Sequence, residues 1–110
     1  MSAFYTMNYL GGTGIGAGAL YIGKGTIVGA DVAGGRYQGT YREEGGRILA
    51  DITLSMPQGG VLVTGQQIPA GARIPLKANW PSAFANGDAM AIAVPGGTVS
   101  VTLQKVGDVP

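Results

Sequence analysis

The chain of 110 residues contains no cysteine and no histidine. Without them it cannot form disulfides, zinc sites of the Cys/His type, thiol nucleophiles, or Ser-His and Cys-His catalytic pairs. The general base that enzymes use most often near neutral pH is also missing. A catalytic site would have to use Asp, Glu, Lys, Arg, Tyr or Ser, and the sequence singles out no such set. We therefore expect no enzyme, no metal site and no cofactor.

Charge is scarce as well, with seven Lys or Arg residues, six Asp or Glu residues and a net charge of +1. These charges are too few and too scattered to neutralise the phosphates of a nucleic acid. No stretch approaches the roughly 18 apolar residues that a membrane-spanning helix needs. The first ten residues, MSAFYTMNYL, lack the basic and apolar regions of a secretory signal. We expect a cytoplasmic protein that contacts neither nucleic acid nor a membrane directly.

Glycine is abundant, with 21 residues, and hydrophobic residues make up 45 % of the chain. The apolar residues recur in every segment, which argues against disorder, and the length suits one domain over residues 1–110. No helix of ten or more residues is evident. Short strands separated mostly by Gly-rich turns are typical of an all-β sandwich or barrel. The eight predicted strands are Ala3–Tyr9, Ala17–Ile22, Thr26–Ala30, Arg36–Arg42, Arg47–Leu54, Arg73–Asn79, Ala89–Val94 and Thr98–Lys105.

Apolar residues alternate with polar ones along several of these strands, which predicts that one face of each is buried. In the strand over residues 47–54 the apolar positions are Ile48, Ala50, Ile52 and Leu54. Hairpin-joined neighbours favour an antiparallel up-and-down meander, and an eight-stranded meander can close into a small barrel without exposed edges. Gly29 and Gly39 lie inside strands, where they suit the sharp bends of such a barrel.

Two glycine-rich segments imitate nucleotide-binding motifs. Residues 12–17 match G-x-G-x-x-A, with Asp31 at a distance that suits a ribose contact, but no helix follows the glycines to bind pyrophosphate. Residues 18–25 come within one residue of a phosphate loop, but Gly25 replaces the Ser or Thr that would reach magnesium. We interpret the first segment as a turn and the second as a strand followed by a hairpin turn at Gly23-Lys24-Gly25.

Aromatic residues mark places for packing or for stacking on a ligand. Tyr37, Gly39 and Tyr41 share one face of a predicted strand, where close packing is the simpler interpretation. Trp80, which precedes Pro81, is expected to anchor a loop over residues 79–86. Tyr37, Tyr41 and Trp80 are therefore candidates for packing or for ligand contact.

Small residues line one face of the strand over residues 89–94. Ala89, Ala91 and Ala93 alternate there with larger apolar residues. Inward-facing alanines would enlarge a cavity in the barrel, whereas outward-facing ones would let another subunit approach closely. The sequence leaves both arrangements open.

Glu43 and Glu44 form the only acidic pair, and we place them in the turn before Gly45-Gly46. If they extended a strand instead, adjacent side chains would point to opposite faces and would not form a catalytic carboxylate pair. The pair is therefore either a solvated turn or an acidic surface for a partner. The segment Ser55–Ala72 is irregular and rich in Gly and Pro, with a short strand expected at residues 61–63.

The segment GKGTIVGADVAGGRYQGTY resembles the signature of the GrlR-like family, small negative regulators of type III secretion genes in bacteria. The shared pattern is Gly-x-Gly-x-Ile-x-Gly-x-Asp followed by Tyr-x-Gly-x-Tyr, and it covers about a fifth of the chain. The matching residues are Gly23, Gly25, Ile27, Gly29, Asp31, Tyr37, Gly39 and Tyr41.

This resemblance implies a lipocalin-like barrel that forms homodimers and inhibits a transcriptional activator by binding it, partly through an acidic segment of four residues. The equivalent place here contains Arg42, Glu43 and Glu44, followed by glycines. With two acidic residues in place of four, electrostatic complementarity to a basic partner would be much weaker. The resemblance nevertheless predicts a regulatory protein-interaction module, with these three residues as its candidate partner-binding site.

An alternative function follows from the predicted barrel itself. Eight-stranded barrels can enclose one small ligand. The alanine-rich strand and the glycines inside strands are compatible with an interior cavity. The alternative is therefore a lipocalin-like barrel that binds a small apolar or amphipathic molecule, and an interior cavity is the feature that would favour it.

Overall fold

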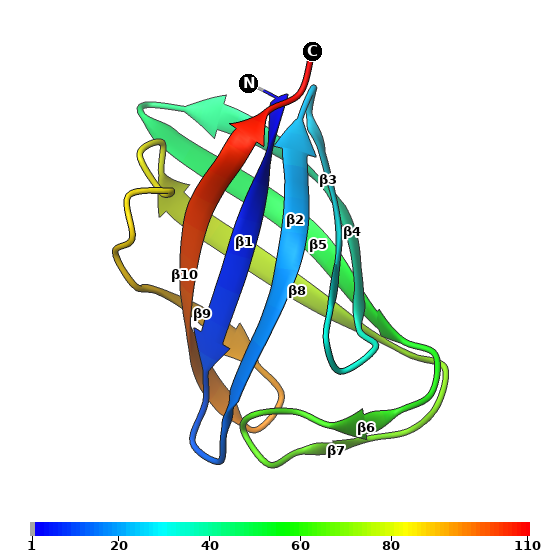
Figure 1. Ribbon diagram of the computed structural model, residues 1–110. Coiled ribbons are helices and arrows are strands. Elements are labelled where there is room, and N and C mark those ends of the chain that lie inside the picture. The colour runs from blue at the N-terminus through cyan, green and yellow to red at the C-terminus, as the bar shows by residue number, and fades with distance from the viewer. Residues whose placement is uncertain (1) are drawn as a thin grey trace.

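Eight long strands form one antiparallel sheet that curls into a nearly closed barrel, shown in Figure 1. The computed structural model describes residues 2–110, and this part of the chain contains no helix. A separate hairpin of two short strands, β6 and β7, lies across one end of the barrel. The strands are β1 (Ser2–Leu10), β2 (Ile15–Gly23), β3 (Thr26–Asp31), β4 (Arg36–Glu44), β5 (Arg47–Met56), β6 (Gly60–Val61), β7 (Gln67–Ile68), β8 (Ala72–Pro81), β9 (Met90–Val94) and β10 (Gly97–Asp108).

The strand order around the sheet is β8-β5-β4-β3-β2-β1-β10-β9. Most hydrogen-bonded neighbours are joined directly by a turn, whereas the β6–β7 hairpin lies in the connection between β5 and β8. The β1–β10 pair brings the first and last strands together. The edge strands β8 and β9 approach each other without a ladder between them. This arrangement confirms the predicted all-β, eight-stranded up-and-down barrel.

Alternation along the strands accounts for the core. The predicted face of β5 points inward, with Ile48, Ala50, Ile52 and Leu54 all buried. The facing strands supply Ile74, Leu76 and Ala78 from β8, and Val99, Val101 and Leu103 from β10. On β5, β8 and β10 the intervening outward positions are mostly polar, as expected for a sheet with one buried face.

The glycines inside strands lie where neighbouring backbones come too close for a side chain. A Cβ at Gly29 would lie 2.3 Å from the carbonyl oxygen of Ala19, and a Cβ at Gly39 would lie 2.2 Å from that of Asp51. Real Cβ atoms do not approach so closely, so glycine permits the tight bend of a small barrel at these places. The interpretation of Gly29 and Gly39 as bend residues agrees with this geometry.

Two tight hairpin turns contain glycine, and one of them corrects a predicted boundary. Lys24 and Gly25 both have positive φ in the two-residue turn between β2 and β3, which is the geometry that such hairpins favour. Glu43 and Glu44 belong to the end of β4, paired with Ile48 and Arg47, and not to the turn as predicted. The Gly45-Gly46 turn is so short that the β4–β5 ladder includes both Glu43 and Glu44.

The loop predicted at residues 79–86 begins later than expected. Trp80 is the last inward-facing residue of β8, where it pairs with Ile48 and is 2 % exposed, so it belongs to the barrel core. The turn that follows places Phe84 in the core, with ring centroids 5.9 Å from Trp80 and 5.1 Å from Tyr5. The burial of Trp80 and Phe84 holds this turn, which connects β8 to β9, against the barrel core.

The alternation of β9 resolves the orientation of its alanines. Ile92 is buried and faces inward, whereas Ala91 and Ala93 are exposed on the outside of the barrel, as is Ala89 just before the strand. The alanines therefore do not enlarge the interior.

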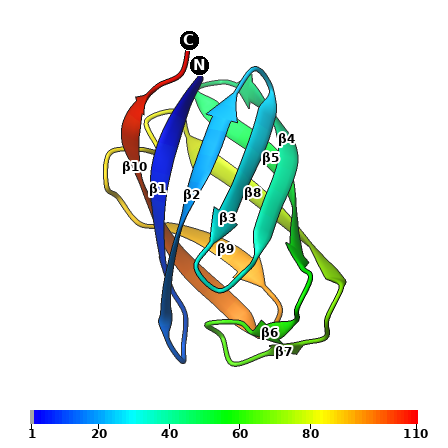
Figure 2. The ribbon, with the colours of Figure 1, turned by 45° about the vertical axis from the view of Figure 1, so that its right-hand side comes forward.

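The two ends of the barrel differ, as Figure 2 shows from a second direction. Both termini lie at one end, which is filled by core side chains such as Tyr5, Ile22 and Trp80. The β6–β7 hairpin lies at the other end. Among residues 2–110 there is no helix long and apolar enough to cross a membrane.

Candidate functional site

A cavity of about 200 Å³ lies inside the barrel at the end covered by the β6–β7 hairpin. Its walls are mostly apolar and include Met7, Leu54, Leu76, Ile92, Val99 and Val101. Ile15 and Val32 also line it, and each is 80 % exposed, so they form a rim at which the cavity meets solvent. The barrel interior is thus filled at one end and hollow at the other.

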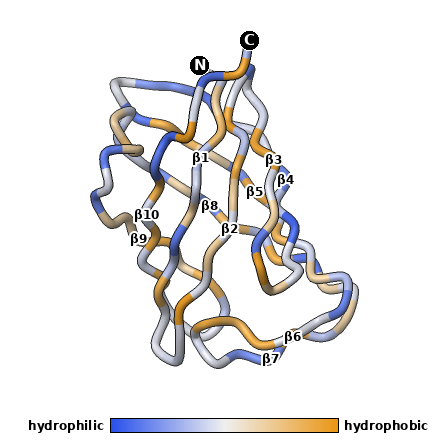
Figure 3. The backbone as a smooth tube through the Cα atoms, viewed as in Figure 1, coloured by the Kyte–Doolittle hydropathy of each residue, from blue (hydrophilic) through white to orange (hydrophobic). Residues whose placement is uncertain are grey.

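The β6–β7 hairpin forms the floor of this cavity. Leu62 and Val63, just after β6, line the cavity together with Val61. Figure 3 shows a hydrophobic stretch that follows β6 and a hydrophilic stretch beside β7. The apolar residues 61–63 of the first stretch line the cavity. The short strand predicted over residues 61–63 is therefore shifted to Gly60–Val61, and its apolar residues contact the cavity.

Three hydrogen bonds hold the hairpin to the barrel. The backbone amide of Thr13 donates to the carbonyl of Val63 at 2.8 Å, and the Thr13 hydroxyl donates to the same oxygen at 2.9 Å. The Thr64 hydroxyl donates to the carbonyl of Pro95 at 2.7 Å. The β1–β2 turn and the β9–β10 turn are thus each hydrogen-bonded to the tip of the hairpin.

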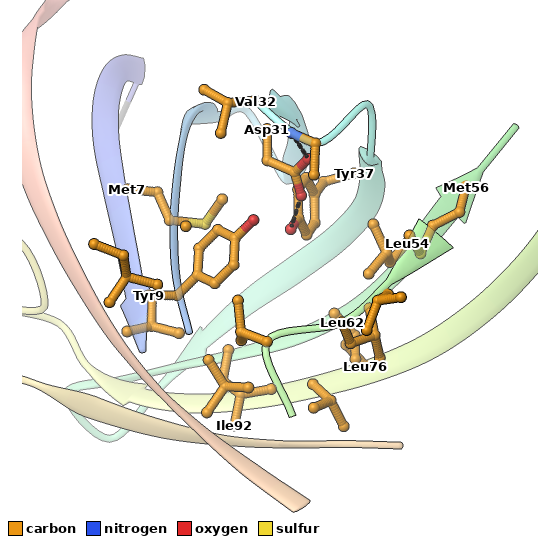
Figure 4. A pocket seen from close by; sticks show the side chains of 18 residues that line it. Met7, Tyr9, Asp31, Val32, Tyr37, Leu54, Met56, Leu62, Leu76 and Ile92 are labelled. Atoms are coloured by element: carbon orange, nitrogen blue, oxygen red, sulfur yellow. Dashed lines mark hydrogen bonds between the residues drawn. The ribbon is translucent and has the colours of Figure 1, made fainter. Parts of the chain in front are cut away.

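One wall of the cavity carries a polar cluster made by Tyr9, Asp31 and Tyr37, drawn in Figure 4. The Tyr37 hydroxyl donates to Oδ2 of Asp31 at 2.7 Å. Oδ1 of Asp31 accepts the backbone amides of Ala33 at 3.0 Å and Gly35 at 2.8 Å. The hydroxyl of Tyr9 points toward the Asp31–Tyr37 pair. A carboxylate is thereby fixed at the edge of an apolar cavity.

Local sequence explains how this cluster is built. Asp31 is the last residue of β3 and faces inward like Ile27, and the tight turn that follows bends two amides back to its carboxylate. A Cβ at Gly35 would lie 2.6 Å from Asp31 Oδ2, and one at Gly16 would lie 2.2 Å from the Tyr9 ring. Glycine at both positions makes room for the acidic and aromatic side chains.

Burial raises the pKa values of the two phenols of the cluster. Burial, followed by the negative charge of Asp31, raises the pKa of Tyr9 from its ordinary value of 10.0 to about 12. Burial, followed by the hydrogen bond to Asp31, also raises the pKa of Tyr37. Groups with such pKa values are poor bases at neutral pH, and they act there as hydrogen-bond donors and acceptors.

Of the predicted ligand or packing residues, the structure places only Tyr37 at the cavity. Tyr41 is half-buried on the inner face of β4 and packs against the core, and Trp80 is buried in the filled end. Neither of them lines the cavity.

The predicted partner-binding residues lie on β4, at its end beside the Gly45-Gly46 turn. Arg42 and Glu44 share the outer face and form an ion pair with each other, with side chains 67 % and 57 % exposed. Glu43 is also exposed. The ion pair neutralises part of the acidic charge, so this segment presents less negative charge than its sequence suggests.

Tyr9 was not among the predicted site residues, and Asp31 was named only as a ribose contact in a nucleotide-binding near-match and as part of the GrlR-like pattern. The sequence contains a pattern that could have identified both residues, because Tyr9 and Asp31 continue the inward-facing alternation of their strands. An acidic residue on an inward face, with a glycine pair three residues later at Gly34-Gly35, is unusual enough to indicate a site.

No protein-family model, curated protein or solved structure matches this chain. The resemblance to the GrlR-like family therefore stays a prediction. Within residues 2–110 no group of three or more His, Cys, Asp or Glu side chains is placed to hold a metal ion. The site is thus described by its own chemistry: an apolar chamber with one carboxylate and two phenols on its wall.

Proposed function

We propose that this protein is a non-enzymatic barrel that binds a small, largely apolar molecule in the cavity beneath the β6–β7 hairpin. The observation that carries this proposal is the cavity itself, which combines an apolar lining with polar groups on one wall. Ligand sites in proteins commonly join a mostly hydrophobic lining to a few placed polar groups.

The volume of the cavity limits the size of the ligand. A cavity of about 150 Å³ lined by apolar side chains can hold benzene, and the cavity here measures about 200 Å³. A single ring with a short side chain fills such a volume. The polar groups on one wall favour a molecule with an apolar body and one polar end.

The test uses 2-phenylethanol as a neutral probe of this size. We expect it to shift the NMR signals of cavity residues such as Leu62 and Ile92 in a saturable way. We expect Ile92→Phe, which fills the cavity, to weaken this binding about tenfold or more. Ala93→Phe places the same ring on the outer face of β9, and it is expected to bind the probe like the wild type.

Circular dichroism establishes that both variants keep the β-sheet spectrum before their affinities are compared. Should Ile92→Phe fail to fold, Val94→Phe fills the same cavity from the same strand. If the wild-type protein binds none of 2-phenylethanol, ethylbenzene and 2-phenylethylamine, the proposed function is wrong.

A second candidate function is contact with another protein chain, as the family resemblance predicts. The observation that favours it is the outer face of β1, β2 and β3, where the residues that point away from the core carry no charge. That face includes Phe4, Ala19, Tyr21 and Val28, with Phe4 50 % and Val28 46 % exposed. A second copy of this chain suits such a face, because no like charges oppose self-association.

Regulation of a transcriptional activator through Arg42, Glu43 and Glu44 remains the finer version of this second candidate. The Arg42–Glu44 ion pair reduces the free acidic charge that a basic partner would meet. Co-purification of an activator that is lost in a Glu43→Gln, Glu44→Gln variant would support that version.

A further inference from the structure

The polar wall of the cavity has the chemistry of a cation site. We infer that the ligand is a small amine whose ammonium group binds Asp31 while its apolar body fills the chamber beneath the hairpin. This inference rests on the proposed function and adds the chemical class of the ligand to it.

The carboxylate of Asp31 has an acceptor position to offer. An ionised carboxylate has about four lone-pair positions, and three hydrogen bonds occupy them here: two backbone amides on Oδ1 and the Tyr37 hydroxyl on Oδ2. The remaining position is on Oδ2, the oxygen held beside Tyr37. A donor that enters the cavity can therefore bind there without displacing the bonds that hold the loop.

No cation of the chain balances this carboxylate among the residues that the structure describes. The ion pairs in residues 2–110 join Arg42 to Glu44, Lys77 to Asp51 and Lys105 to Asp108, and none includes Asp31. A charge facing an apolar cavity is costly unless it is paired. A cationic ligand supplies the partner that the protein lacks.

The two tyrosines complete the match to an ammonium group. An ammonium has three N–H donors, and the acceptors on this wall are Asp31 Oδ2 and the hydroxyl oxygens of Tyr9 and Tyr37. A neutral alcohol would use one of these acceptors and leave the charge of Asp31 unpaired.

The experiment compares three probes of nearly equal shape: 2-phenylethylamine, 2-phenylethanol and ethylbenzene. By calorimetry at neutral pH we expect the amine to bind the wild-type protein about tenfold more tightly than the alcohol or the hydrocarbon. Asp31→Asn keeps an oxygen that can accept the two loop amides but removes the charge. It should reduce the affinity for the amine about tenfold and change the affinity for the alcohol by less than about threefold.

Asp51→Asn is the matched control, because it removes a carboxylate from the outer face of β5. It should leave all three affinities unchanged. If the alcohol and hydrocarbon bind as tightly as the amine, the inference is wrong while the proposed function stands. If none of the probes binds, the proposed function fails with it. An amine preference that Asp31→Asn leaves intact would place the ammonium elsewhere and overturn the assignment to Asp31.

Discussion

At the scale of single residues, the tyrosines of the cavity link ligand chemistry to folding stability. Tyr9 and Tyr37 have raised pKa values in the folded protein because they are buried beside Asp31. In the unfolded chain their phenols ionise near pH 10. The folded state therefore holds protons that the unfolded state loses at high pH, and linkage then lowers stability as pH rises.

We expect the free energy of unfolding to be fully maintained below about pH 10 and to fall as the pH rises toward about 12 and beyond. The fall is at most about 1.4 kcal/mol per pH unit for each phenol that stays protonated. The total loss from Tyr9 is smaller, because its pKa rises only to about 12 and its partial exposure weakens the effect. Urea unfolding across this pH range measures the loss of stability.

The variant Tyr37→Phe should make this loss shallower. The control Tyr21→Phe, on the outer face, leaves Tyr9 and Tyr37 in place and should preserve the loss. An equal slope in all three proteins would contradict the role of Tyr37.

The same residues show where sequence reasoning reached its limit. Alternation is enough to predict that Ile48 and Ile52 face inward, because the period of a strand is two. It cannot predict that Asp31 and Tyr9 meet, since they come from strands separated by β2. Their meeting depends on the register of two ladders and on the missing side chain at Gly16.

At the scale of elements, the long strands were predictable and the short hairpin was not. Each long strand has its own alternation and bounding glycines, and these local signals are sufficient. The β6–β7 hairpin has only two residues per strand. Leu62 and Val63, which follow β6, are partly buried against the barrel core, whereas Val61 is 59 % exposed. Its position depends on contacts with the turns at Thr13 and Pro95, which are far from it in sequence.

The attachment of this hairpin is expected to control access to the cavity. A Thr13→Val, Thr64→Val variant keeps the side-chain shapes but loses both hydroxyl bonds to the backbone, each worth about 1 kcal/mol. Because the amide of residue 13 bonds to Val63, its hydrogen exchange reports lifting of the hairpin. We expect that exchange to become about tenfold faster or more.

The control variant Thr6→Val, Thr102→Val removes two hydroxyl bonds of the same kind within the β1–β10 ladder, where backbone pairing continues on both sides. It should leave exchange at residue 13 unchanged. Equal exchange in the two variants would mean that the apolar contacts of Leu62 and Val63 alone hold the hairpin in place.

At the scale of the whole molecule, charge is distributed unevenly over the barrel surface. The outward residues of β4, β5 and β8 include Arg36, Arg42, Asp51, Arg73 and Lys77. The opposite part of the wall carries a row of apolar side chains across neighbouring strands, in which Phe4 pairs with Tyr21 and Tyr21 pairs with Val28. A sheet face of this kind is where a monomer in water has most to gain from association.

We therefore expect a homodimer at micromolar concentration, formed through the row of Phe4, Tyr21 and Val28. A stable interface buries about 800 Å² on each partner, and a lysine within this row would be buried twice by symmetry. Light scattering should show a dimer for the wild type and a monomer for Val28→Lys. Thr40→Lys adds the same charge on the outer face of β4 and should remain dimeric, whereas a monomeric wild type would contradict the expectation.

Dimerisation and ligand binding should be separable because they use different surfaces. The apolar row lies on the outside of the barrel, whereas the cavity opens at the end where Ile15 and Val32 form its rim. A monomeric Val28→Lys variant should accordingly bind 2-phenylethanol with the wild-type affinity. If it did not, the outer face and the chamber would be coupled through β3, whose outward Val28 lies three residues before the inward Asp31.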